Sequence, residues 1–121
     1  MNTPVNFESA KVLKEKGFNE PCTQLYFDGE LKDITIQKVS YDDTVSSRYY
    51  IAPTIAEVVM WLYEKHGIWI CIDKAEDFNW WKFNIRKLND IGYERIGFGS
   101  ELNSPKEAYE AGIIYTLKNL I

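Results

Sequence analysis

Residues 52–81, APTIAEVVMWLYEKHGIWICIDKAEDFNWW, decide the fold of this chain. They open with a helix signal, because Thr54 precedes Glu57 by three residues in the capping-box pattern, which satisfies two free backbone N–H groups. Apolar residues then recur on one helical stripe, namely Ile55, Val58, Val59 and Leu62. Gly67 is a natural helix stop directly after His66. The pattern predicts a buried helix from Thr54 to His66.

A pair of strands is predicted directly after this helix. Residues Ile68–Asp73 place isoleucines on one face and Trp69 and Cys71 on the other, so we expect a strand covered on at least one side and central in its sheet. Segment 80–86 alternates between an apolar set and a mostly polar set. The short connection between the two favours an antiparallel hairpin. Residues 93–98 predict a third strand.

Two further helices are marked near the ends of the sequence. The first is expected to begin after Asn6 and to end at Gly17, with Phe18 folding back onto its last turn. The second is expected to begin after Ser104, where Glu107 predicts a second capping box. Apolar residues recur at helical spacing from there to the last residue, which predicts a helix with a buried stripe.

The segment between the first two helices is less regular. Residues 25–27 precede Asp28 and Gly29, a pair that tolerates positive φ, so a strand entering a tight turn is predicted. A second strand is expected over residues 34–37, where apolar and polar residues alternate, and the two strands would form a hairpin. Residues 41–51 predict an exposed loop followed by either a short strand or an approach to the next helix.

These elements together predict a single α+β domain over residues 1–121. We expect a mainly antiparallel sheet of about 3–5 strands packed with three helices, which are N-terminal, central and C-terminal. A chain of 121 residues with 45% hydrophobic residues can bury a core without disulfides.

Composition excludes several classes of protein. The net charge of -4 argues against a large electrostatic footprint for nucleic acid. No apolar run approaches the ~18 residues of a membrane span. The start of the chain also lacks the basic and apolar segments of a signal peptide. We therefore expect a cytoplasmic protein with no membrane association, in which Cys22 and Cys71 are free thiols.

The sequence contains no recognisable constellation of catalytic or metal-binding residues. His66 is the single histidine, and its expected position at a helix end suits a cation favoured by the helix dipole. Cys71 is predicted in a buried strand, and Cys22 in a loop without neighbours that would lower its pKa. The acidic residues 42–43 and 73–77 lack the spacing and glycine of a calcium loop. We therefore expect no catalytic residue, no metal and no cofactor.

One surface remains as a candidate binding site, the mostly polar face of segment 80–86. It consists of Trp80, Lys82, Asn84 and Arg86, with Arg95 as a further member. Aromatic rings beside cations on an open sheet can stack bases or bind an acidic peptide. The structural alternative is that a helix covers Trp80 and that the charges lie at the rim.

Three motifs carry a resemblance. They are KEKGF at residues 14–18 followed by Pro21 and Cys22, the helix that opens with APT at 52–54 and contains WLYEK, and the terminal helix that opens with SPKEA at 104–108. In these motifs the chain resembles small phage- and prophage-type proteins from gut bacteria. The resemblance implies an origin in mobile elements and a bacterial cytoplasm. It implies no activity and no catalytic residues.

The function expected from these observations is binding rather than catalysis. We expect a non-enzymatic phage-type accessory protein that binds another protein, with a homodimer as an open alternative for the partner. The second hypothesis is a module that binds single-stranded nucleic acid through Trp80, Lys82 and Arg86. The third is an enzyme whose site is assembled from residues far apart in the sequence.

Overall fold

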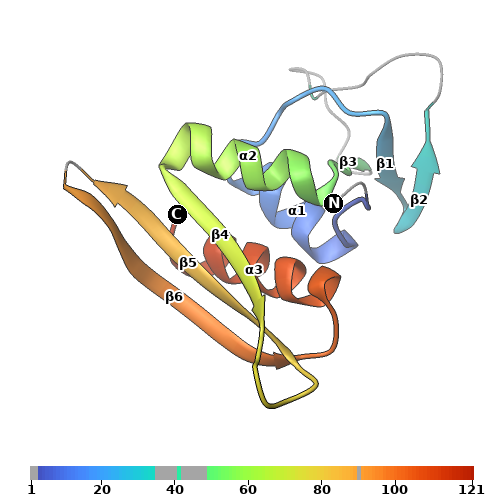
Figure 1. Cartoon of the computed structure of the whole chain (residues 1–121). Helices are drawn as coiled ribbons and strands as arrows, with labels where there is room; N and C mark the ends of the chain where they lie inside the picture. The colour runs from blue at the N-terminus through green and yellow to red at the C-terminus, as the bar shows by residue number, and fades with distance from the viewer. Residues whose placement is uncertain (1–2, 35–40, 42–48, 90) are drawn as a thin grey trace.

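The computed structural model describes residues 3–34, 41, 49–89 and 91–121, which form three helices and two antiparallel sheets (Figure 1). The helices are α1 (Phe7–Glu15), α2 (Ile55–His66) and α3 (Pro105–Asn119). The strands are β1 (Gln24–Phe27), β2 (Glu30–Asp33), β3 (Tyr49–Ile51), β4 (Ile68–Lys74), β5 (Trp81–Asn89) and β6 (Gly92–Leu102). The predicted α+β class is confirmed, with two three-stranded sheets in place of the single sheet that the sequence predicts.

The larger sheet has the order β4-β5-β6, with β5 in the centre. Both pairings are antiparallel, which confirms the predicted hairpin and the predicted third strand. The prediction that β4 is central is wrong, because β4 is an edge strand. Its second apolar face is not core, since Trp69 is exposed and Cys71 is half-buried.

The inner face of this sheet carries much of the core. Ile70, Phe83 and Ile85 are buried there, and α3 lies against the same face (Figure 1). Gly112 of α3 permits a close approach, because a Cβ at this position would lie 3.0 Å from Cγ2 of Ile70. Gly99 of β6 is covered by the Phe83 ring, and a Cβ there would lie only 2.3 Å from that ring. The two glycines therefore let the helix and the ring pack directly on the strands.

Helix α1 begins and stops close to where its sequence predicts. Asn6 Oδ1 accepts a hydrogen bond from Ser9 N at 2.9 Å, which confirms the N-cap. Gly17 has a φ of 89°, and Phe18 N donates to Leu13 O at 2.9 Å. Phe18 is buried, so the predicted fold-back of this residue is confirmed.

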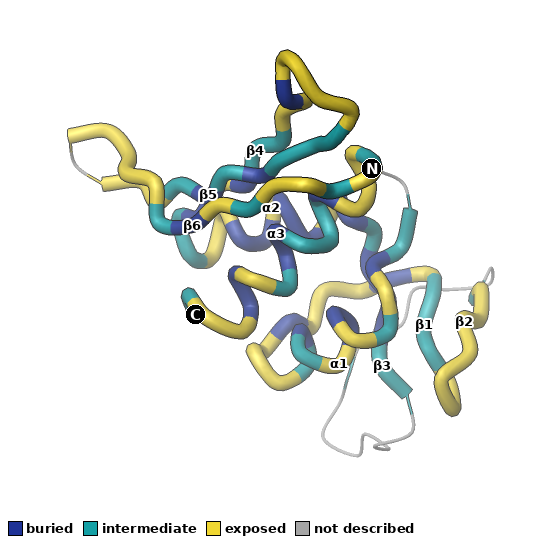
Figure 2. The backbone as a smooth tube through the Cα atoms, turned by 90° about the horizontal axis from the view of Figure 1, so that it is seen from below, coloured by how far each residue is buried: buried dark blue, intermediate teal, exposed yellow. Residues whose placement is uncertain are grey.

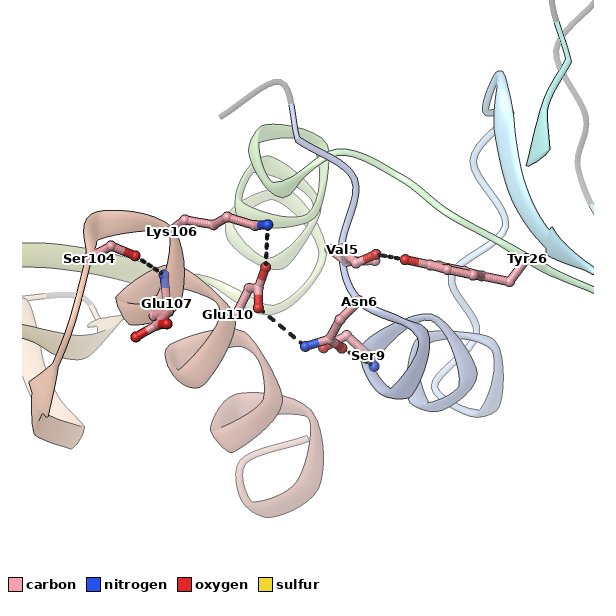
Figure 3. Close-up of polar contacts among 8 residues, drawn as sticks. All are labelled: Val5, Asn6, Ser9, Tyr26, Ser104, Lys106, Glu107 and Glu110. Carbon is pink, nitrogen blue, oxygen red and sulfur yellow. Dashed lines mark hydrogen bonds and ion pairs between the residues drawn. The ribbon is translucent and has the colours of Figure 1, made fainter. Parts of the chain in front are cut away.

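The capping boxes of the other two helices differ. Thr54 Oγ1 accepts from Glu57 N at 3.2 Å, and the Glu57 carboxylate accepts from Thr54 N at 3.0 Å, so the box of α2 is confirmed. At α3, Ser104 Oγ accepts from Glu107 N at 3.1 Å (Figure 3). The Glu107 carboxylate instead accepts from Asn103 N at 3.0 Å, one residue before the N-cap. Of the two hydrogen bonds predicted for the capping box of α3, the bond to Ser104 Oγ is therefore confirmed, and the bond to Ser104 N is replaced by the bond to Asn103 N.

The smaller sheet has the order β2-β1-β3. Asp28 and Gly29 form the predicted tight turn, with φ values of 50° and 81°. The strand after this turn begins already at Glu30, before the predicted strand at 34–37. Residues 35–37 and most of the predicted loop, 42–48, lie outside the described residues. Of the two alternatives for residues 49–51, the structure shows the short strand, which is β3 and pairs with β1.

Polar contacts join this smaller sheet and α1 to α3 (Figure 3). The Tyr26 hydroxyl donates to Val5 O at 2.7 Å, while Asn6 Nδ2 donates to the Glu110 carboxylate at 3.4 Å. Burial, with a smaller contribution from Glu110, raises the pKa of Tyr26, so its hydroxyl keeps its proton. Figure 2 shows buried stretches on all three helices as well as on the larger sheet.

The described residues contain no helix that could cross a membrane. None of its helices combines the length and the apolar composition that a bilayer span needs.

Candidate functional site

The strand register brings three of the predicted site residues together on one face. Lys82, Asn84 and Arg86 occupy alternate positions of β5, opposite to the buried Phe83 and Ile85. Their cross-strand partners are Asp73, Cys71 and Trp69 on β4, and Phe98 and Arg95 on β6. We call these eight residues, on the side of the sheet away from α3, the outer face.

Trp80, the fourth predicted site residue, precedes β5 and belongs to the turn from β4. Its half-buried ring stacks on Phe78, with ring centroids 5.4 Å apart and an interplanar angle of 14°. Ala75 N donates to Trp80 O at 3.0 Å and closes the turn. The tryptophan opposite Arg86 is Trp69 instead.

A groove opens where the outer face meets α2. It has a volume of about 470 Å³ and is lined by Met60, Tyr63, Trp69, Arg86, Leu88 and Tyr93. We call these six residues the aromatic groove. Trp69 is 37% exposed and Tyr93 is 58% exposed, although large aromatic side chains are usually mostly buried. The groove therefore gathers exposed apolar side chains from one helix and three strands.

The direct passage from α2 into β4 builds this groove. Gly67 caps α2 with a φ of 65°, so β4 begins one residue after the cap. Leu88 N donates to Gly67 O at 2.9 Å and ties β5 to the same corner. The reversal brings the Tyr63 ring edge-on to the Trp69 ring, with centroids 5.6 Å apart. The wall of the groove is thus fixed by backbone geometry and by a ring contact.

The outer face carries three cations, Lys82, Arg86 and Arg95, and one carboxylate, Asp73. The Arg86 guanidinium lies 4.7 Å from the centroid of the Tyr93 ring, and the Arg95 guanidinium lies 5.0 Å from that of Phe98. Among the described residues, neither arginine has a carboxylate oxygen within 4.0 Å. Both guanidiniums are therefore held by rings and remain able to bind an anion.

A second, smaller groove lies on the other flank of α2. Its volume is about 360 Å³, and its lining is Phe18, Glu20, Pro21, Glu57, Met60, Trp61 and Glu64. Trp61 is buried there against Phe18, and Glu57 is held by the capping box. This groove therefore exposes less aromatic surface than the aromatic groove does.

The histidine and the cysteines are placed in packing positions. His66 is the last residue of α2, as predicted, and its ring meets Trp61 with centroids 5.1 Å apart. Cys22, expected in a loop, is buried within the core, and its Sγ lies 3.3 Å from Glu20 O. Cys71 lies half-buried on the outer face beside Asn84. Within the described ranges, no three His, Cys, Asp or Glu residues are grouped so that they could hold a metal ion.

A cluster of tyrosines lies at the opposite side of the molecule, near α1. Lys14 Nζ is 4.8 Å from the centroid of the Tyr41 ring and 5.0 Å from that of Tyr50. Burial is the main cause that raises the pKa of Tyr41, and its hydroxyl accepts from Ile51 N at 2.6 Å. A neutral, hydrogen-bonded hydroxyl is a poor general base, so we interpret this cluster as the link between α1 and β3.

Sequence reasoning missed most of the aromatic groove. Met60 and Tyr63 lie outside the apolar stripe of α2, and a large apolar side chain outside that stripe is the local signal that could have marked them. Leu88 and Tyr93 are cross-strand partners near the end of β5, and this pairing depends on the register. No local pattern shows that the helix and the strands share one groove.

Comparison of the chain with protein-family models, with curated proteins and with solved structures finds no match.

Proposed function

We propose that this chain is a non-enzymatic, phage-type accessory protein of the bacterial cytoplasm that binds another protein through the aromatic groove. One observation carries the proposal, namely the gathering of exposed apolar side chains from α2, β4, β5 and β6 around one hollow. Exposed apolar clusters of this kind, rimmed by polar residues, typically mark sites of protein interaction. The phage origin rests on the resemblance of the KEKGF, APT and SPKEA motifs.

The groove has the composition of an energetic hot spot. Tyrosine, tryptophan and arginine are enriched at the centres of protein interfaces, where they are shielded from water. Trp69, Tyr63 and Arg86 supply one of each within a single lining. Covering a large exposed apolar side chain completely is worth about 1.5–3 kcal/mol. A partner that covers three or four of these side chains partway gains part of the free energy that a specific complex needs, and contacts around the groove must supply the rest.

Single-stranded nucleic acid is the second candidate partner. The observation in its favour is that Lys82, Arg86 and Arg95 share the outer face with Trp69 and Phe98. Two observations weigh against it. The rings of Tyr93 and Phe98 are each in contact with a guanidinium, which competes with base stacking. The chain also has a net charge of -4. A protein partner fits the groove better.

Affinity capture with matched variants tests this proposal. The baits are the wild type, the groove double variant Tyr63→Ala/Trp69→Ala, and Phe27→Ala. Phe27 is a suitable control because it is 41% exposed and belongs to the smaller sheet. From a lysate of the cells that carry this gene, we expect a protein that the wild type and Phe27→Ala both retain. The groove variant should lose it about tenfold or more, because truncating a hot-spot residue costs about 2 kcal/mol or more.

Quantitative mass spectrometry of the captured proteins gives the readout, and thermal melts confirm that all three baits are folded. Capture that is equal for the wild type and the groove variant would contradict the proposal.

A further inference from the structure

Two arginines stand directly opposite each other on neighbouring strands. Arg86 of β5 and Arg95 of β6 are cross-strand partners next to a register shift between the two strands, and both side chains project from the outer face. Directly opposite side chains have Cβ atoms about 4.5–5.5 Å apart, and like charges at this separation destabilise a sheet. The fold keeps this unfavourable pair on the outer face, where Arg86 is half-buried and Arg95 is exposed.

The described residues do not neutralise this pair. Each guanidinium lies over an aromatic ring, and neither has a carboxylate oxygen within 4.0 Å. Asp73 belongs to the same face, but its cross-strand partner is Lys82. Glu94 is the neighbour of Arg95 in sequence, and strand alternation turns it to the other face, opposite Lys87. An anion supplied by a partner would therefore meet two unpaired guanidiniums.

We propose that the partner in the aromatic groove is an acidic protein segment, with an apolar side chain in the groove and carboxylates beside Arg86 and Arg95. The inference rests on the proposed function, because it names the chemistry of the partner at the same site. Arg86 belongs to both features, since it lines the groove and faces Arg95. A carboxylate beside the groove would form charge-assisted hydrogen bonds with one or both guanidiniums. The net charge of -4 opposes any anion at long range, so the selection of acidic over basic segments depends on direct contact with these two guanidiniums.

A carboxylate fits this site better than a nucleic-acid backbone. A chain of phosphates is bound along a track of many cations, whereas the groove itself has one cation and five apolar or aromatic residues. An apolar side chain followed by an acid matches this arrangement. Nucleic acid is therefore the competing outcome of the test.

The experiment titrates the full chain with three polymers and follows tryptophan fluorescence. The probes are poly(Glu,Tyr), which combines carboxylates with aromatic side chains, poly(Lys,Tyr) and oligothymidylate. We expect poly(Glu,Tyr) to bind, and high salt to weaken this binding. Arg86→Gln and Arg95→Gln should each weaken it about tenfold or more, because a hydrogen bond to a charged group is worth about 1.5–3 kcal/mol.

Lys87→Gln is the matched control. Lys87 follows Arg86 directly and is exposed, but strand alternation places it on the opposite face, so its removal should change binding less than about twofold. Stronger binding of oligothymidylate than of poly(Glu,Tyr) would overturn the inference in favour of nucleic acid. Equal losses in Lys87→Gln and the two arginine variants, or no binding of poly(Glu,Tyr), would also overturn it.

The two proposals can fail separately. A protein that is captured through the groove and is retained equally by Arg86→Gln and Arg95→Gln would overturn the acidic partner and leave the proposed function standing. Capture that does not depend on Tyr63 and Trp69 would overturn the proposed function itself.

Discussion

At the scale of single residues, the Arg86 and Arg95 pair should cost the free protein stability. Arg95→Glu would place a carboxylate opposite Arg86, and an opposite-charge pair contributes about 0.2–1 kcal/mol in a sheet. We therefore expect the free energy of unfolding to rise by roughly this amount, as measured by urea denaturation. The same change should abolish binding of an acidic partner. Residues at binding sites commonly show such an exchange of stability for function.

Lys87→Glu is the control for this substitution, because it should change the free energy of unfolding in the opposite direction. Lys87 is the cross-strand partner of Glu94, so reversing its charge places two carboxylates opposite each other. We expect a small loss of stability from Lys87→Glu and a small gain from Arg95→Glu. Equal losses from both variants would show that the arginine pair carries no cost.

At the scale of elements, the C-terminal half of α3 should anchor the core. Leu117 is fully buried, so Leu117→Ala should lower the free energy of unfolding by about 2–5 kcal/mol. Its neighbour Lys118 is exposed and forms an ion pair with Glu8 of α1. Lys118→Ala should cost less than about 1 kcal/mol, because exposed ion pairs contribute little. Urea denaturation of the two variants measures the difference, and similar losses would contradict this account of α3.

The helices could be predicted well because their signals are local. Asn6, Thr54 and Ser104 lie within three residues of the N–H groups that they cap, and Gly17 and Gly67 adopt the positive φ that their positions suggest. The strands of the larger sheet could be predicted because periodicity and short connections favour a meander. Caps and periodicity do not depend on the rest of the chain.

Neither the strand order nor the groove could be predicted, because both depend on which strands pair with each other. Trp69 and Cys71 gave β4 the pattern of a strand with two buried faces, because an exposed apolar face has the same sequence pattern as an apolar face in the core. Three of the four predicted site residues lie on the outer face, since alternation along β5 decides their direction. Trp80 lies before that strand, where a turn decides its direction instead.

At the scale of the whole molecule, the two faces of the larger sheet differ, because a helix covers one face and leaves the other open. Helix α3 covers β4, β5 and β6 on the inner side (Figure 1), whereas α2 packs against β4 at the edge of the sheet and lines the aromatic groove. The outer side keeps exposed aromatic rings and two guanidiniums that have no carboxylate partner among the residues that the structure describes. A sheet with one covered and one open face is stable in water when the open face is polar, and the rings on this face are the surface that the proposed partner would cover.

The most direct test of this claim is photo-crosslinking from within the groove in the cells that carry the gene. Tyr63 is replaced by benzoylphenylalanine in one protein, and Phe27 of the smaller sheet is replaced in the control. We predict one dominant protein adduct from position 63 and no such adduct from position 27, with the linked peptide containing Asp or Glu. The absence of an adduct at position 63, or the same adduct from both positions, would contradict the account.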